Sequence, residues 1–261
     1  MKVSLIQMKT SGGKESRLER ARELALSAAG SDFIMLPEMF CCPYSSASFV
    51  ENAEEEGGPV TEALSSIARE TGAVLIGGSM PELDRGRIYN TCFVYGPGGE
   101  RLAKHRKAHL FDIDVAGGQR FFESDTLSAG DGPTVFDTPH GRAGVCVCFD
   151  IRFPELICAM RGAELLFVPA AFNMTTGPLH WELLFRARAV DLQAFAFGCA
   201  PAREPGAGYV SYANSIAVSP WGRVIARAGE DECVLTAEFD IAEAARAREQ
   251  IPVGNPVPVK R

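Results

Sequence analysis

The residue with the clearest chemical potential is a cysteine at the junction of a predicted strand and a predicted helix. Cys148 ends the apolar run 144–148, which predicts a buried strand. Pro154 opens the next apolar segment and is typical of the first turn of a helix. This layout is that of a nucleophile elbow with sulfur in place of oxygen, and it indicates acyl transfer through a thioester. The alternative is a thiol that is simply a small buried apolar group.

Two charged residues in apolar surroundings could complete such a site. Glu38 follows the apolar run 33–36, and burial there would raise the pKa of its carboxyl and make it a proton acceptor. Lys107 belongs to the basic segment 104–109, which continues into an apolar pair and is therefore expected to turn partly inward. A buried lysine needs a carboxylate partner, and beside a reacting carbonyl it stabilises an oxyanion. Taken singly, a capping carboxylate and a solvated basic face are the ordinary alternatives.

Glu38, Lys107 and Cys148, in this order, resemble the Glu-Lys-Cys triad of the nitrilase superfamily of carbon–nitrogen hydrolases. Further blocks that resemble this family cover essentially the whole chain: 77–82, 89–91, 106–115, 123–131, 148–156 and 171–182. Several blocks in the right order are more specific than any single residue. The resemblance implies an α/β fold, a four-layer αββα sandwich, which is also the simplest packing for two sheets between helices.

Within this family the sequence is most similar to the ω-amidase branch, through the blocks 109–115, 123–131 and 175–178. Members of that branch hydrolyse the terminal amide of 2-oxoglutaramate and 2-oxosuccinamate to the 2-oxo dicarboxylate and ammonia. The resemblance therefore implies an amidase that acts on a small anionic amide with water and without a cofactor. Alternatives are a deaminated glutathione amidase, an N-carbamoyl amide hydrolase, a non-catalytic binding subunit or a metal-binding cysteine protein.

The resemblance also implies a role for each residue of the site. Glu38 is the general base that takes the thiol proton of Cys148. Lys107 and the backbone N–H of Phe149 receive the oxyanion. Glu123 matches a second glutamate of the family that positions the lysine and keeps it protonated despite burial. The alternative for this second glutamate is a carboxylate at the start of a loop or helix.

The carboxylate of such a substrate needs a cationic partner, and Arg152 is the candidate. It lies four residues beyond the nucleophile at the start of the following helix, where a guanidinium can fork two hydrogen bonds onto a carboxylate. In the family this arginine binds the substrate carboxylate. The alternative is a salt bridge to Asp150 or Glu155. Weaker candidates for the same pocket are Phe172, Thr175 and Thr176.

Several other residues have more ordinary interpretations. His180 precedes the amphipathic run 181–190, whose apolar spacing predicts a packed helix and, from the resemblance, part of a subunit interface. His105 and His109 flank the lysine without a second set of residues at metal-ligand spacing, so we expect no metal site. His105 stands where the family often has tyrosine, and Leu192 stands where it usually has asparagine. These departures bear on substrate preference rather than on the reaction.

The bulk properties favour a compact enzyme. The 261 residues are 46% hydrophobic, and we expect a single domain over 1–261 with an extended, proline-containing tail from about 251. The net charge of −7 argues against binding to nucleic acids or to anionic membranes. The eight cysteines lack a CxxC pair, and neither a signal peptide nor a membrane-spanning segment is apparent, which favours a cytoplasmic protein with reduced thiols. The family resemblance also implies that the protein forms a homodimer.

The pattern of apolar runs and turn residues alternates between strands and helices. Helices are predicted over 15–29, 60–70 and 181–190. Strands are predicted over 3–8, 33–36, 73–77, 89–95, 101–106, 143–148, 165–168, 195–199, 214–218, 223–226 and 233–239. The elements before Glu38, Lys107 and Cys148 must therefore end close together if these residues share a site.

Overall fold

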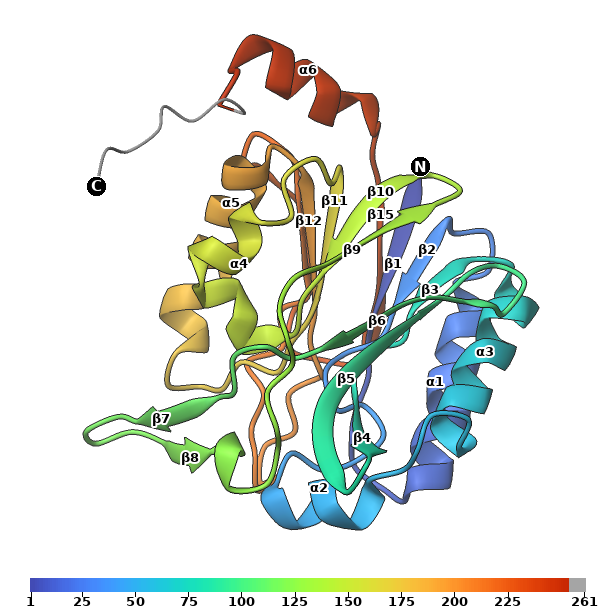
Figure 1. Cartoon of the computed structure of the whole chain (residues 1–261), viewed down its shortest axis with the longest axis vertical. Coiled ribbons are helices and arrows are strands. Elements are labelled where there is room, and N and C mark those ends of the chain that lie inside the picture. Colours follow the sequence, from blue (N-terminus) through green and yellow to red (C-terminus); the bar gives the residue numbers. More distant parts are fainter. Residues whose placement is uncertain (254–261) are drawn as a thin grey trace.

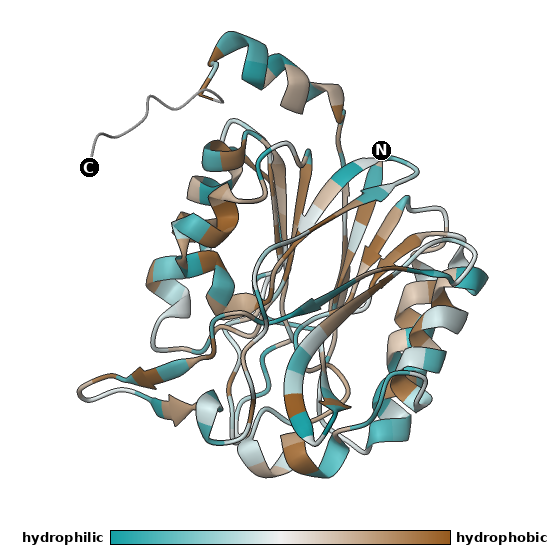
Figure 2. Cartoon of the chain, viewed as in Figure 1, coloured by the Kyte–Doolittle hydropathy of each residue, from teal (hydrophilic) through white to brown (hydrophobic). Residues whose placement is uncertain are grey.

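Two large β-sheets pack face to face, and helices cover their outer sides (Figure 1). The structure is a computed structural model that describes residues 1–253. Apolar residues are concentrated on the strands between the two layers of helices, whereas the helices alternate between apolar and polar residues (Figure 2). The predicted α/β fold, a four-layer αββα sandwich, is therefore confirmed.

The first sheet has a parallel centre and antiparallel edges. β1 (Lys2–Gln7), β2 (Phe33–Met35) and β3 (Val74–Ile76) run parallel and are buried along almost their whole length. Parallel strands covered on both faces are continuous apolar runs, which is why the sequence predicts them. β15 (Cys233–Glu238) pairs antiparallel with β1 at one edge. The other side consists of β5 (Arg87–Tyr95), β4 (Met80–Asp84) and β6 (Arg101–Arg106).

The second sheet repeats this arrangement. β10 (Gly141–Val145), β11 (Leu165–Pro169) and β12 (Phe195–Cys199) form its parallel centre. Antiparallel strands flank them, namely β9 (Thr134–Thr138), β13 (Ile216–Val218) and β14 (Val224–Arg227). Side chains of the two sheets meet in one apolar core, for example Phe33 and Phe167, whose ring centroids are 5.1 Å apart.

Helices close the sandwich on both sides. α1 (Lys14–Ser27) and α3 (Pro59–Thr71) pack on the first sheet, and their buried side chains form a second apolar cluster with it. α4 (Pro154–Cys158) and α5 (Gly177–Leu192) cover the second sheet. The remaining elements are α2 (Ser46–Asn52), α6 (Ala242–Gln250) and the hairpin of β7 (Asp112–Asp114) and β8 (Arg120–Phe122).

Most predicted elements are present, with shifted ends. The helix predicted over 181–190 is longer, Gly177–Leu192, and Leu192 is buried in the core at its last turn. The strand predicted to reach Cys148 ends at Val145, because the chain already turns there. The sequence did not predict α2, α6, β4, β9 or the β7–β8 hairpin. α6 is rich in alanine and charge and buries only two alanines, so it has no clear apolar pattern.

The predicted tail is described only at its beginning. Residues 251–253 follow α6 without forming a helix or a strand. Residues 254–261 lie outside the described part of the chain. The prediction of an extended tail therefore stays a prediction.

Candidate active site

Cys148 lies on a sharp turn between the second sheet and the helices that cover it. It begins the 3₁₀ helix η2 (Cys148–Arg152) with φ of +48°, a left-handed conformation that is uncommon for residues other than glycine. Asp150 holds this turn, since its carboxylate accepts a hydrogen bond from the backbone N–H of Val147 at 3.1 Å. The elbow predicted from the sequence therefore has the backbone strain expected of it, although the strand ends three residues earlier than predicted.

Lys107 lies between two glutamates in the interior of the protein. Its Nζ is 3.0 Å from Glu38 Oε1 and 2.9 Å from Glu123 Oε2. All three side chains are fully buried. Glu38 follows β2, Lys107 follows β6, and Glu123 begins the short 3₁₀ helix after β8, so the three come from separate parts of the chain. One cation thus serves two carboxylates.

This arrangement of one lysine between two carboxylates influences the pKa of the Glu38 carboxyl. Burial raises the pKa of the Glu38 carboxyl, the positive charge of Lys107 opposes this, and the negative charge of Glu123 raises it further. The net direction is upward. The pKa of Lys107 is also raised, because the two carboxylates outweigh the effect of burial. The cluster therefore combines a permanently charged lysine with a carboxylate of increased basicity.

Cys148 is adjacent to this cluster and is held as a thiol. Burial and the negative charge of Glu38 raise its pKa well above the usual range, while Lys107 and the backbone of Ala171 act in the opposite direction. The interaction of the Cys148 thiol with the Glu38 carboxylate contributes to the shift. A thiol with a raised pKa needs a base before it can act as a nucleophile, and Glu38 is the carboxylate in contact with it.

Four further groups support the cluster, three of them by direct hydrogen bonds to its carboxylates, and sequence reasoning missed them. Glu38 Oε1 accepts from Asn90 Nδ2 at 2.8 Å, and Oε2 accepts from the backbone N–H of Ala171 at 2.8 Å. Tyr44 donates to Glu123 Oε1 at 2.6 Å, and Tyr209 donates to the carbonyl of Ala171. Asn90 lies in one of the blocks that resemble the family, so that signal could have found it. The two tyrosines have no local signal.

Asp150 connects the segment after Lys107 to the turn at Cys148 through hydrogen bonds. It accepts from the backbone and Nδ1 of His109 at 2.8 and 3.0 Å and lies 3.0 Å from His105 Nε2. These contacts lower the pKa of the Asp150 carboxyl, although burial opposes them. Both histidines therefore act as structural partners of a buried carboxylate, and His105 makes this contact where the family often has tyrosine.

Arg152 does not form the salt bridge to Asp150 or Glu155 that was the alternative to binding a substrate. Asp150 is engaged by the two histidines, and within residues 1–253 no acidic side chain lies within ion-pair distance of Arg152. Its guanidinium carbon is 4.8 Å from the ring centroid of Phe172 and 5.6 Å from that of Phe149. Arg152 Nη1 instead contacts His180 Nδ1 at 3.0 Å. A cation without an anion in an aromatic setting is available for an anionic ligand.

The two threonines differ in their surroundings. Thr175 is exposed, and its methyl group lies close to Gly118 at the tip of the β7–β8 hairpin. Thr176 hydrogen-bonds Asn173 Oδ1 through its backbone N–H at 2.9 Å and its hydroxyl at 3.2 Å. Within the described residues, the Thr176 hydroxyl is thus engaged in the turn before α5 rather than directed at a ligand.

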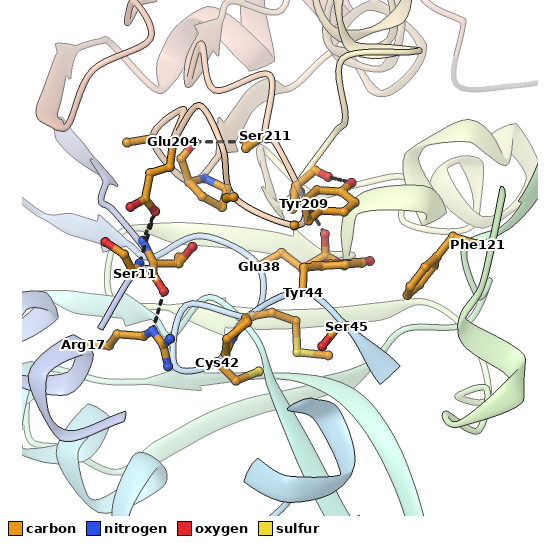
Figure 3. A pocket seen from close by; sticks show the side chains of 18 of the residues that line it. Ser11, Arg17, Glu38, Cys42, Tyr44, Ser45, Phe121, Glu204, Tyr209 and Ser211 are labelled. Carbon is orange, nitrogen blue, oxygen red and sulfur yellow. Dashed lines mark hydrogen bonds between the residues drawn. The ribbon is translucent and has the colours of Figure 1, made fainter. Parts of the chain in front are cut away.

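A cavity of about 700 Å³ opens next to the cluster, and Glu38 is one of its lining residues, whereas Lys107, Cys148 and Arg152 are not. Figure 3 shows Tyr44 and Tyr209 together on its wall, and their rings stack with centroids 4.5 Å apart. Phe121 of the hairpin lies on one side, and Arg17 and Glu204 lie at the other end. Water can therefore reach the Glu38 carboxylate from this cavity.

No group of three or more His, Cys, Asp or Glu side chains within residues 1–253 is placed to hold a metal ion. No helix in this part of the chain combines the length and apolar character needed to cross a membrane.

Comparison with known proteins identifies the family. A sequence profile described as "Carbon-nitrogen hydrolase" matches residues 2–249. This chain belongs to the carbon–nitrogen hydrolase family. The predicted membership of the nitrilase superfamily is therefore confirmed.

Individual relatives agree over nearly the full length. Omega-amidase NIT2-A of Xenopus laevis is 54% identical over 97% of this chain and 93% of its own. Omega-amidase NIT2 of Homo sapiens is 48% identical with the same coverage. Among solved structures, Saccharomyces cerevisiae Nit3, a member of branch 10 of the nitrilase superfamily, matches with a TM-score of 0.89 at 38% identity. That match covers 98% of this chain and 95% of the yeast chain.

Proposed function

We propose that this protein is an ω-amidase that hydrolyses the terminal amide of 2-oxoglutaramate and 2-oxosuccinamate to the 2-oxo dicarboxylate and ammonia. The observation that carries the proposal is the buried Glu38–Lys107–Glu123 cluster beside a strained cysteine, together with Arg152 a few residues beyond it. Relatives named omega-amidase that match 97% of the chain at 48–54% identity support the same activity. The chain is thus an amidase of carbon–nitrogen bonds.

Acylation begins with the thiol proton. Glu38 takes it from Cys148, and the sulfur attacks the amide carbon to form a tetrahedral intermediate. Lys107 Nζ and the backbone N–H of Phe149 stabilise the oxyanion, which is the group whose charge increases most in this step. Glu38 then gives the proton to the nitrogen. The carbon–nitrogen bond breaks, ammonia leaves, and a thioester to Cys148 remains.

Deacylation reuses the same base. A water molecule from the cavity loses a proton to Glu38 and attacks the thioester carbon. The carbon–sulfur bond breaks, the sulfur regains the proton, and the 2-oxo dicarboxylate is released. Glu123 keeps Lys107 charged and in place throughout, because its carboxylate contacts Nζ at 2.9 Å. No redox step or cofactor is needed.

Arg152 binds the carboxylate of the 2-oxo acid end. The guanidinium lies between aromatic rings, where a charge-assisted hydrogen bond is stronger than in water. The backbone of Phe172 and the side chains of Thr175 and Thr176 are weaker parts of the same proposed pocket. The Thr176 hydroxyl already has a protein partner, so its contribution is the smallest of the three.

A deaminated glutathione amidase is the second candidate, because it would use the same Glu-Lys-Cys chemistry. The specific observation in its favour is the cavity of about 700 Å³ beside Glu38, which could take the longer part of such a substrate. An N-carbamoyl amide hydrolase is the third. The substrates differ in length and charge, so they separate the three activities directly.

The first test is ammonia release from 2-oxoglutaramate and 2-oxosuccinamate, compared with deaminated glutathione and an N-carbamoyl amino acid. Cys148→Ala removes the nucleophile and is expected to lower kcat/KM by more than about 10⁴-fold. Cys146→Ala is the matched control, because Cys146 is a buried thiol two residues earlier on the same segment. Turnover confined to deaminated glutathione or the carbamoyl compound would overturn the ω-amidase assignment. It would remain consistent with the proposed roles of Glu38, Lys107 and Cys148.

We further propose a homodimer that uses the outer face of α5. Apolar side chains are exposed there, among them Leu179, Leu183 and Val190, and Trp221 lies beside them. Exposed apolar groups that cluster in this way favour a protein partner. Leu183→Lys should shift the mass measured by light scattering from dimer to monomer, whereas a wild-type mass of one chain would contradict the proposal.

We also propose that the chain is one catalytic domain that works in a cytoplasmic, reducing setting. Its eight cysteines are all unpaired, and the mechanism requires a free thiol at Cys148. Fractionation of the producing cells, with the protein followed by antibody, tests the location.

A further inference from the structure

The contact between Arg152 and His180 constrains the chemistry of both side chains. A guanidinium has five N–H donors and no acceptor, so across the 3.0 Å contact Arg152 Nη1 donates and His180 Nδ1 accepts. His180 is then a neutral imidazole with its proton on Nε2. Burial and the positive charge of Arg152 lower the pKa of His180, which favours the same neutral form.

The rest of the guanidinium is left without an acceptor in the described part of the chain. Arg152 Nε is buried and has no hydrogen-bond partner within residues 1–253. A buried donor without a partner costs free energy, and an added acceptor removes that cost. Because His180 occupies Nη1, the edge formed by Nε and Nη2 remains for a fork of two parallel hydrogen bonds.

His180 is itself held in place. It lies in the first turn of α5, where its backbone N–H donates to the carbonyl of Thr176 at 2.9 Å. The next residue, Trp181, is fully buried and donates from Nε1 to the carbonyl of Asn214 at 2.7 Å. The imidazole is thus attached to a rigid part of the core and contacts Arg152 from a different element.

We propose that His180 is a specificity-determining residue, which orients the Arg152 guanidinium so that its Nε edge receives the carboxylate of the substrate. The inference rests on the proposed function and extends it, because it assigns a role to a residue that does not touch the scissile amide. A guanidinium held in one orientation loses less conformational entropy when the carboxylate binds. Removal of the imidazole therefore weakens the binding of carboxylate substrates and leaves the chemical step unchanged.

The test compares two substitutions on two substrates. His180→Ala removes the acceptor, whereas His180→Asn places an amide oxygen close to the position of Nδ1 and retains it. For 2-oxoglutaramate we expect His180→Ala to raise KM about tenfold with kcat within about twofold, and His180→Asn to remain within about threefold in KM. For butyramide, which has no carboxylate, kcat/KM should not change in either variant.

His140→Ala is the matched control, since His140 is a partly exposed histidine that contacts Asp32 and Phe33 rather than any residue of the site. Thermal unfolding of each variant establishes that it folds. Equal losses on both substrates, an unchanged KM for 2-oxoglutaramate in His180→Ala, or failure of His180→Asn to restore KM would each overturn the role of His180.

A binding measurement separates this inference from the proposed function. If the wild-type protein releases no ammonia from 2-oxo amides, the ω-amidase proposal fails. Calorimetric titration with 2-oxoglutarate then still tests the pair. A dissociation constant about tenfold weaker in His180→Ala than in His180→Asn supports the orientation of Arg152, and equal constants overturn it.

Discussion

Two buried glutamates have carboxyl pKa values that are shifted in opposite directions. Glu82 lies on β4 and contacts Lys104 and Arg106 of β6, whereas Glu38 follows β2 and contacts Lys107, the residue directly after β6. The pKa of Glu82 is lowered to about 2, and the pKa of Glu38 is raised. Residue type, burial and a neighbouring lysine are common to both, so none of these features accounts for the difference.

The number of cations that contact each carboxylate accounts for the difference in pKa. Burial acts to raise the pKa of Glu82, but hydrogen bonds from Arg106, Lys104 and Thr91 outweigh it. Their donors lie 2.7 to 2.8 Å from its oxygens. Two cations therefore contact the buried Glu82, and their other carboxylate partners, Glu56 and Asp84, have side chains that are partly exposed to solvent. This environment makes Glu82 a structural group.

Glu38 has one cation, and it shares this cation with a second carboxylate that is also fully buried. Lys107 contacts Glu123 as closely as it contacts Glu38, so burial is offset only in part and the negative charge of Glu123 adds to it. A carboxylate in this position binds a proton more readily and can act as a base near neutral pH. The number of cations that contact a buried carboxylate thus separates the proposed catalytic base, Glu38, from the structural Glu82.

The largest expected effect is on activity, from replacing each glutamate by its amide. Glu38→Gln should lower kcat/KM for 2-oxoglutaramate by about 10³-fold, because the base is lost while the shape is kept. Glu82→Gln should change it by less than about threefold at a temperature where the variant is folded. Ammonia release by the two variants, with circular dichroism to establish folding, measures both. Similar losses in both variants would show that Glu38 and Glu82 do not differ in their importance for activity.

The second effect is on stability, from removing one lysine of each cluster. Lys107→Gln leaves two buried carboxylates without a cation and should lower the free energy of unfolding by about 4 kcal/mol. Lys104→Gln leaves Arg106 on Glu82 and should cost less than about 1 kcal/mol. Urea unfolding at neutral pH measures the difference. Adding Glu123→Gln to Lys107→Gln should recover part of the loss, and no recovery would contradict the shared charge.

The third effect is the acid sensitivity of the Glu82 cluster. Its folded-state pKa of about 2 lies below the ordinary value of 4.5, so its contribution to stability is present above pH 4.5 and is lost as the pH falls towards 2. The contribution is about 3 kcal/mol. The stability difference between wild type and Glu82→Gln should therefore shrink from pH 6 to pH 2.5 in urea titrations. A constant difference would argue against ionisation as its source.

The smallest effect is on the pH profile of the reaction. The negative charge of Glu123 raises the pKa of Glu38, so Glu123→Gln should lower it. The acidic limb of kcat/KM would then move to lower pH by about one unit. Glu123→Asp keeps the charge and is the control, with its limb expected near the wild-type position. A limb that stays in place in Glu123→Gln would show that Glu123 acts only by holding Lys107.

The elbow was predictable from the sequence because its determinants are local. An apolar run, a cysteine and a proline six residues later specify a strand, a turn and a helix without any distant contact. The end of the strand was not predictable, since it depends on Asp150, whose carboxylate bonds Val147 and the two histidines together. The resemblance to a known family supplied Glu38, Lys107 and Glu123 in advance.

Other members of the site come from contacts that no local pattern encodes. Tyr44 follows a proline in an apolar loop, and Tyr209 lies in a glycine-containing loop after β12, so both sequences are typical of ordinary turns. His180 was interpreted as part of a packed helix, which its neighbour Trp181 fits, while the histidine itself contacts Arg152. Two adjacent residues of α5 therefore have different surroundings: Trp181 is buried in the core, and His180 contacts Arg152.

The sequence by itself determined the order of most strands and helices, the continuous apolar runs that become buried parallel strands, and the position of the proposed nucleophile. Each of these depends on residues close together in the chain. The tertiary structure decided how many cations each buried carboxylate receives, because Lys107 reaches Glu38 across 69 residues and Ala171 reaches it across 133. Acid strength follows from burial and neighbouring charge, and both are set only when distant segments pack together.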